Sequence, residues 1–239
     1  MNPAFARRLT AEFTGTGLLV AVVVGSGIAA VGLTGDAALR LLINSLVTAM
    51  GLAVLILVFT PAGGAQFNPV VTGADWVLRR RTASRYAPIQ AAAVIAAQVG
   101  GAIAGAALAD AMFGQVTLTP SHTERNGAPL LLSEVVATAG LLLIIVALAR
   151  TDRIQHASWA VGAWIGAAYW FTASTAFANP AVTVGRTLTD TYAGIAPGSA
   201  PAFILAQIAG GTLGTLLAVA LYPLRNTEAH ADAQAELAG

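Results

Sequence analysis

The chain has 239 residues, of which 56% are hydrophobic and only 10% are charged, with a formal net charge of +1 at pH 7 and no cysteine. A soluble domain carries about 45–50% apolar and about 25% charged residues, so this composition excludes a chain that covers its surface with polar groups in water and predicts a membrane protein. It also excludes disulfides, thiolate metal sites and cysteine nucleophiles, and the small net charge gives no sign of nucleic-acid binding.

Six apolar runs are long enough to cross a bilayer as helices, which takes about 20 residues each. They cover residues 10–33, 39–60, 86–109, 129–149, 157–177 and 200–223. Two further segments, 69–79 and 180–189, have a helical pattern but are too short to span. Each begins after an Asn, a favoured N-cap, with Pro at the first helical position. The pattern predicts an all-α membrane protein with six transmembrane helices and two half-length helices.

The basic residues predict the orientation of the chain. All twelve are Arg, and only Arg40, Arg125 and Arg186 lie outside the start, the segment after the first Asn-Pro pair, the link between the fourth and fifth spans and the end. The other nine are Arg7, Arg8, Arg79, Arg80, Arg81, Arg85, Arg150, Arg153 and Arg225. By the positive-inside rule both termini are cytoplasmic, which agrees with an even number of spans in the cell's inner (plasma) membrane.

The two halves of the chain repeat. "AEFTGTGLLV" compares with "SEVVATAGLL", which aligns Glu12 with Glu134, and "AQVGGAIAG" compares with "AQIAGGTLG", which aligns Gln98 with Gln207. Because each half carries three spans, the second half enters the membrane from the opposite side, as an inverted repeat. The expected parts are a first half at 1–113, an extracellular link at 114–128, a second half at 129–225 and a cytoplasmic tail at 226–239.

The leads into the half-length helices, residues 60–67 and 172–178, are irregular and rich in Gly, Ala and Ser. Irregular backbone at membrane depth is tolerated only where it is buried in protein or lines a wet cavity. We therefore expect both leads to line a pore, with Asn68 and Asn179 at its centre. The converging helix N-termini carry about half a positive charge each and would repel cations. The chemistry is passage of solutes, with no enzyme activity, no cofactor and no metal site.

These residues resemble the aquaporin, or major intrinsic protein, family over about residues 5–225. The resemblance rests on "AEFTGT", on "GGAQFNP" and on the paired motifs Asn68-Pro69-Val70 and Asn179-Pro180-Ala181, where Val70 replaces the usual Ala. It implies a homotetramer with one pore in each protomer. It also implies that Glu12 and Glu134 support the two re-entrant loops by accepting their backbone N–H groups. Gln98 and Gln207 are expected to form hydrogen bonds between helices.

The resemblance also assigns a selectivity filter. Family members commonly carry Arg three residues after the second motif's Asn, where this chain has Val182. The remaining filter positions, counted from the motifs, fall on Thr48, Ala167 and Ala176, so we expect a wide and weakly polar filter. We hypothesise that Arg186, one turn beyond Val182 and about 6 Å nearer the outer mouth, supplies charge to the vestibule.

This filter resembles that of the bacterial aquaglyceroporin subgroup linked to arsenic resistance. The leading interpretation is a passive channel for small uncharged solutes, namely water, glycerol-like polyols, arsenite or methylated arsenicals. Two alternatives stay open, a water-selective aquaporin and an ion-coupled secondary transporter. The expected partners are these solutes, membrane lipid and further copies of the chain. The aromatic residues of the fifth span are expected at the interface and facing lipid. They are Trp159, Trp164, Tyr169, Trp170 and Phe171.

Overall fold

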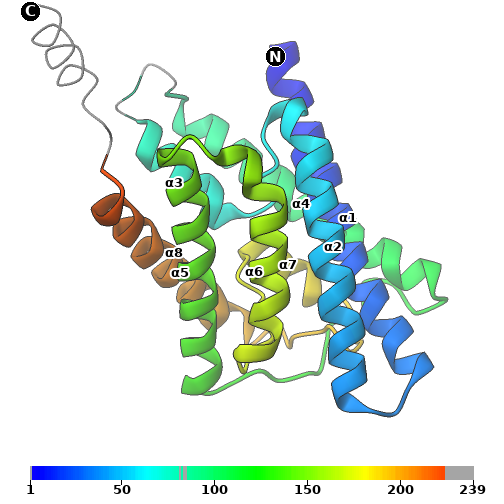
Figure 1. Ribbon diagram of the computed structural model, residues 1–239. Helices are drawn as coiled ribbons and strands as arrows, with labels where there is room; N and C mark the ends of the chain where they lie inside the picture. The colour runs from blue at the N-terminus through cyan, green and yellow to red at the C-terminus, as the bar shows by residue number, and fades with distance from the viewer. Residues whose placement is uncertain (1, 81, 83–84, 224–239) are drawn as a thin grey trace, which may run out of the picture.

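A computed structural model describes residues 2–80, 82 and 85–223, and the described part of the chain is helical with no strand (Figure 1). The expected tail at 226–239 lies outside the described residues. The α-helices are α1 (Pro3–Leu33), α2 (Ala37–Gly63), α3 (Pro69–Arg79), α4 (Pro88–Met112), α5 (Ala128–Arg150), α6 (Ala157–Phe171), α7 (Pro180–Arg186) and α8 (Ala200–Leu221), with a 3-10 turn, η1 (Ile154–His156), before α6.

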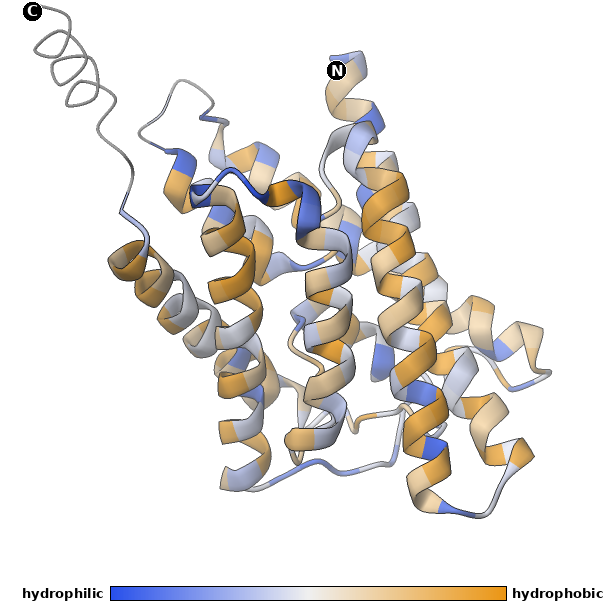
Figure 2. Ribbon diagram, viewed as in Figure 1, coloured by the Kyte–Doolittle hydropathy of each residue, from blue (hydrophilic) through white to orange (hydrophobic). Residues whose placement is uncertain are grey.

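Five of the described helices, α1, α2, α4, α5 and α8, are long and apolar enough to cross a membrane. The sixth, α6, has 15 residues, which span about 22 Å of a hydrocarbon core about 30 Å thick. Figure 2 shows hydrophobic residues along the helices and hydrophilic ones gathered on the connections at both ends of the bundle. This distribution is that of a multi-pass membrane protein.

Three expected boundaries are corrected by the structure. The fifth span was expected to reach residue 177 but ends at Phe171, because Thr172 turns to an extended conformation with φ −112° and ψ 143°. The second half-length helix ends at Arg186 instead of residue 189. The first irregular lead begins at Gly64, since the helix continues through Pro61 to Gly63. The irregular backbone available to line a pore is therefore residues 64–67 in the first half and residues 172–178 in the second half.

The two halves place their helices in matching pairs. In the first half α1 packs along α4, and in the second half α5 packs along α8. The half-length helices lie between these pairs, and each also contacts the other half, α3 through α8 and α7 through α1 and α4. In Figure 1, α6 stands between α5 and α2, so that it and α2 join the two halves on this side. Both half-length helices are therefore enclosed by the long ones.

The helices of each matching pair pack with their backbones in contact, because glycine residues lie where they cross. A Cβ atom added to Gly105 on α4 would lie 2.0 Å from the carbonyl oxygen of Gly17 on α1. A Cβ atom on Gly214 of α8 would lie 2.0 Å from the carbonyl oxygen of Ala139 on α5. Small residues at such crossings allow helices to approach closely where lipid offers no hydrophobic driving force for association. The glycines of the repeat therefore set the spacing of the walls around α3 and α7.

The Gly105 contact leads to the first prediction. Gly105→Ala should lower the free energy of unfolding by about 1–3 kcal/mol, because the new methyl group forces α4 away from α1. Thermal unfolding of the purified protein in detergent measures the change. Gly32→Ala is the matched control, since Gly32 is also helical but has no atom within 4 Å of its added Cβ. Equal melting temperatures for the two variants would show that the helices do not need this close approach.

Candidate functional site

The two Asn-Pro pairs begin α3 and α7 by capping them. The Oδ1 atom of Asn68 accepts the backbone N–H of Val70 at 3.0 Å. The Oδ1 atom of Asn179 accepts the N–H groups of Ala181 at 3.0 Å and Val182 at 3.3 Å. Each cap satisfies donors that the first helical turn leaves unpaired. Both amides are thereby held with their nitrogen atoms turned away from their own helices.

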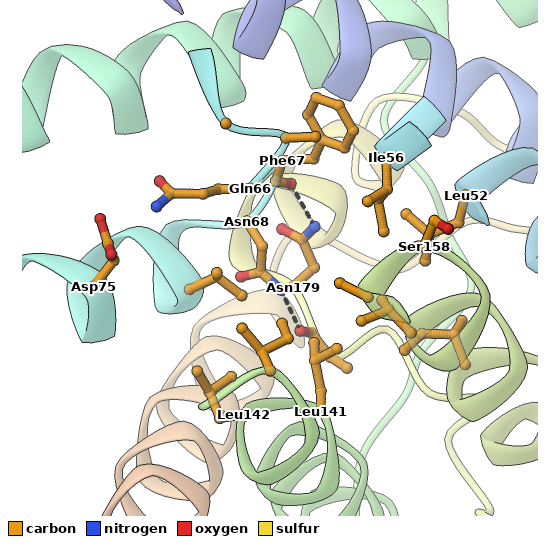
Figure 3. A pocket seen from close by; sticks show the side chains of 18 of the residues that line it. Leu52, Ile56, Gln66, Phe67, Asn68, Asp75, Leu141, Leu142, Ser158 and Asn179 are labelled. Atoms are coloured by element: carbon orange, nitrogen blue, oxygen red, sulfur yellow. Dashed lines mark hydrogen bonds between the residues drawn. The ribbon is translucent and has the colours of Figure 1, made fainter. Parts of the chain in front are cut away.

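The same two amides cross between the halves (Figure 3). Asn68 Nδ2 donates to the carbonyl oxygen of Ala178 at 2.8 Å, and Asn179 Nδ2 donates to that of Phe67 at 2.7 Å. The N-terminal ends of α3 and α7 thus meet, and each motif holds the loop that leads into the other. An amide nitrogen carries two hydrogens, so one N–H of each Asn remains for a molecule in the adjoining cavity.

A buried carboxylate supports the first loop. Glu12 on α1 has no exposed surface, and it accepts the backbone N–H groups of Gln66 at 2.9 Å and Phe67 at 2.8 Å. Gln98 on α4 donates to the same carboxylate at 2.8 Å and to the hydroxyl of Thr72 at 2.9 Å. This network ties α1, the loop, α3 and α4 together.

The second half repeats the arrangement around Glu134 on α5. Its carboxylate accepts the backbone N–H groups of Phe177 and Ala178, both at 2.9 Å. The hydroxyl of Ser174 and the side-chain amide of Gln207 each donate to it at 2.6 Å. Glu134 is also fully buried, and its oxygens are occupied by hydrogen bonds to the loop and to α8. Both carboxylates therefore lie where they fix backbone.

The loops need this support because their backbone is strained. Phe67, Thr175, Ala176 and Ala178 have φ values of 51°, 61°, 48° and 48°. Residues with a Cβ atom rarely adopt this left-handed region, at a cost of about 1–3 kcal/mol each. The positive φ of Phe67 and Ala178 accompanies the two carbonyls that accept the crossing amides. No glycine stands at these positions, so the sequence alone carried no sign of the turn.

A cavity of about 700 Å³ follows the loops. Both Asn side chains line it, and Figure 3 shows them facing one another beside Leu52, Ile56, Leu141 and Leu142. One wall therefore presents amides and loop backbone, while the opposite wall is apolar. Because the N-terminal ends of α3 and α7 meet at its middle, the residues at their C-terminal ends, Arg79 and Arg186, mark its two mouths. Arg79 and Arg150 line one mouth and Arg186 lines the other.

Three of the four expected filter residues line this cavity. Thr48 on α2, Ala176 in the second loop and Val182 on α7 are buried, with exposed fractions of 2%, 3% and 4%. Ala167 does not line it and is exposed on the outside of α6. Its expected place in the filter is therefore corrected. The cavity face of α6 carries Ile165, and two further residues turn the helix by about 200°, which puts residue 167 on the opposite face.

Tyr169 occupies the place expected for Ala167. It lines the cavity with 3% of its surface exposed, and its hydroxyl lies 3.3 Å from Thr48 Oγ1. Its expected position facing lipid is wrong, whereas Trp159, Trp170 and Phe171 are exposed as expected. Trp164 is partly buried and donates to a backbone carbonyl of α5. A signal was present in the sequence, because Tyr169 continues the i, i+4 series of inward residues Val161 and Ile165.

Arg186 lies beyond Val182 at the same end of the cavity. It is 3% exposed, and its Nε donates to the carbonyl oxygen of Ala193. Its guanidinium carbon lies 3.4 Å from the centroid of the Phe177 ring, and that of Arg125 lies 5.1 Å from the same centroid. Both guanidinium groups thus lie near one aromatic ring, whose electron-rich face attracts cations. The ring also belongs to the loop that Glu134 holds.

The link between α4 and α5 is held against the segment between α7 and α8. Arg125 donates through Nε to the carbonyl oxygen of Gly194 at 2.9 Å, and burial lowers the pKa of its guanidinium. His122 donates its backbone N–H to Asp190 at 2.9 Å, and its ring also contacts that carboxylate. These hydrogen bonds lower the pKa of Asp190 from its ordinary value. The link is thereby joined to the segment between α7 and α8 by charged groups on both sides.

Enclosed half-length helices, crossed Asn caps and a cavity between them define a membrane channel with two re-entrant segments. Residues 1–174 match the sequence model of the Major intrinsic protein family. The chain is 48% identical over 215 residues to Aquaglyceroporin AqpS of Rhizobium meliloti, covering 90% of this chain and 88% of that protein. The chain belongs to the major intrinsic protein family, and it is a channel of the aquaporin type, not an enzyme.

Two further proteins are similar to the chain. It is 30% identical over 192 residues to Aquaporin A of Dictyostelium discoideum, covering 74% of this chain and 66% of that protein. The crystal structure of the aquaglyceroporin from Plasmodium falciparum has the same fold, with a TM-score of 0.63 at 18% identity over 89% of this chain and 94% of that one. The all-α fold with six spans, two half-length helices and an inverted repeat, expected from the sequence, is confirmed.

The carboxylate networks lead to the second prediction. Glu134→Ala should destabilise the protein, because the N–H groups of Phe177 and Ala178 lose their acceptor at about 1–3 kcal/mol for each buried donor. Recovery of monodisperse protein in detergent and its melting temperature measure the loss. Glu12→Ala should behave alike, since Glu12 makes the equivalent contacts. Glu124→Ala, at an exposed carboxylate, is the control, and a melting temperature of Glu134→Ala equal to that of this control would contradict the supporting role.

Proposed function

We propose that the chain conducts water and small uncharged solutes wider than water through the cavity between α3 and α7. The observation that carries this proposal is Val182, which is buried at the cavity wall where aquaporins commonly carry Arg. Thr48 and Ala176, both small, line the same region. A small uncharged side chain in place of Arg leaves room for glycerol-like polyols, neutral arsenite and methylated arsenicals. The similarity to a protein named as an aquaglyceroporin supports this solute class.

The centre of the cavity favours neutral solutes that carry hydroxyl groups. Asn68 and Asn179 each offer one N–H to the cavity, and the irregular loops offer carbonyl oxygens. The N-terminal ends of two helices bring about half a positive charge each to the same point, which raises the energy of a cation there. A neutral hydroxyl group can use both the donors and the acceptors without this repulsion. Passive passage therefore requires no ionisable group to change its charge.

Coupled transport is the second candidate, and the buried carboxylates argue against it. Ion-coupled transporters use ionisable groups within the membrane to bind and release the coupling ion. Glu12 and Glu134 already accept three and four hydrogen bonds from the loops and neighbouring helices. A carboxylate in such a network holds structure in place. Flux that depends linearly on the solute gradient and ignores ion gradients distinguishes the channel from the transporter.

The remaining parts of the proposal concern the assembly. The outward faces of the long helices are apolar, and Leu46, Met50 and Val54 of α2 are each more than half exposed. Such faces suit contact with lipid and with further copies of the chain, in a homotetramer with one pore in each protomer. The Arg distribution supports cytoplasmic termini by the positive-inside rule, and the proposed location is the cell's inner membrane. Arg186 and the link between α4 and α5 then lie at the outer mouth.

The Val182 assignment leads to the third prediction. Val182→Arg should lower permeability to glycerol and larger polyols by about tenfold or more, equivalent to about 1.4 kcal/mol in the barrier, while water permeability falls less. Stopped-flow light scattering of proteoliposomes measures both. Val182→Ala, which removes bulk without adding charge, is the control and should leave glycerol flux equal or higher. Equal polyol flux in Val182→Arg and the unmodified protein would show that Val182 lies outside the path.

The fourth prediction concerns Arg186. Because it lines the outer part of the cavity, its charge should oppose the entry of cations. Arg186→Ala should raise cation and proton leak on the order of tenfold, since a unit charge several ångströms away contributes about 1–3 kcal/mol at a partly hydrated site. Ion flux and solute permeability of proteoliposomes measure the effect. Arg186→Lys keeps the charge and should leak less than Arg186→Ala, and unchanged permeability in both variants would remove Arg186 from the vestibule.

A further inference from the structure

We infer that Tyr169 is a specificity-determining residue of this channel, whose ring limits solute width and whose hydroxyl, paired with Thr48, binds the hydroxyl groups of passing solutes. The inference deepens the proposed function and rests on it. It assigns to the filter an aromatic residue that lies two positions beyond the one counted from the second motif. The filter is then narrower and more polar than four small side chains would make it.

The first line of evidence is the register of α6. Val161, Ile165 and Tyr169 line the cavity at a spacing of four residues, which keeps them on one face of a helix. Trp159, Ala163, Ala167 and Trp170 are exposed and form the opposite face. Tyr169 is the last inward residue, because α6 ends two residues later at Phe171. The ring therefore projects where the helix gives way to the irregular second loop.

The second line of evidence is the pairing of Tyr169 with Thr48. The two hydroxyl oxygens lie 3.3 Å apart, and both side chains are almost fully buried. Their helices, α6 and α2, come from different halves of the chain and pack against one another. Each hydroxyl offers one hydrogen and two lone pairs. The bond between them uses one hydrogen, so the other can be donated into the cavity.

The third line of evidence is the composition of the surrounding wall. Ala176 and Val182 line the same cavity from the second loop and α7. Neither side chain can form a hydrogen bond, so in this ring of residues Thr48 and Tyr169 provide the side-chain hydroxyls. A solute with hydroxyl groups along one edge and carbon along the other matches a wall with polar and apolar parts. The substrate class is small neutral polyhydroxy compounds whose width fits beside one phenol ring.

Tyr169→Ala removes the ring and should shift the size limit upward. In proteoliposomes, the ratio of xylitol to glycerol permeability should rise about tenfold, because relief of a steric obstruction in a packed site is worth that much or more. Tyr169→Phe keeps the ring and should preserve the order of the size series water, glycerol, erythritol and xylitol. It should lower polyol permeability about fivefold relative to water, the effect of one neutral hydrogen bond. Thr48→Val should produce a change in the same direction as Tyr169→Phe.

Ala167→Phe is the matched control, since it adds an aromatic ring to the same helix at the position counted from the motif. Its ring should face outward and leave the size series unchanged, and melting temperatures of all variants test their folding. The inference would be overturned, and the proposed function would stand, if Ala167→Phe lowered the ratio of xylitol to glycerol permeability while Tyr169→Ala left it unchanged. Unmodified protein that conducts no polyol would contradict the proposed function and, with it, this assignment.

Discussion

Two buried carboxylates hold irregular backbone in the middle of the bundle, and the remaining features of the site depend on this interaction. Glu12 and Glu134 accept the N–H groups of the residues just before each Asn-Pro pair. Without these acceptors the donors would be unpaired at membrane depth, where each costs several kcal/mol. With them, Phe67 and Ala178 adopt left-handed backbone, and their carbonyls meet the opposite Asn side chains. The central crossing is therefore a consequence of two carboxyl groups buried one layer behind it.

The inverted repeat explains why a buried carboxylate supports an irregular loop in each half of the chain. Each half brings one carboxylate, one glutamine, one threonine and one capped half-length helix to matching places. Because the copies enter from opposite sides, the positive ends of α3 and α7 face each other, and a cation finds repulsion from both directions. The apolar wall opposite the loops provides no compensating charge. In the proposed channel, selection against ions thus follows from the arrangement of helices, while the side chains nearer the mouth select among neutral solutes.

Those side chains show where counting along a sequence fails. Ala176 and Val182 line the cavity three residues before and after Asn179, and Thr48 lines it from α2, twenty residues before Asn68. Ala167 is separated from Asn179 by the end of α6 and a strained loop, so a change of two residues in that connection rotates the helix face by about 200°. The mouth that results combines the phenol of Tyr169, the hydroxyl of Thr48 and an arginine stacked on Phe177.

The sequence by itself determined the class of protein, the number of spans, the repeat and the paired motifs. Hydrophobic length, helix-capping chemistry and charge distribution are local properties that need no knowledge of neighbouring chain. It also indicated Glu12 and Glu134, because the repeat aligns them and the family resemblance implies that they support the two loops. The spacing of Val161, Ile165 and Tyr169 puts them on one face of a helix, but only the tertiary structure decided that this face of α6 turns inward. It also decided that Arg125 and Arg186 lie against one ring, and that the loops are left-handed without glycine. Each of these depends on contacts between segments far apart in the chain, whose geometry no local pattern encodes.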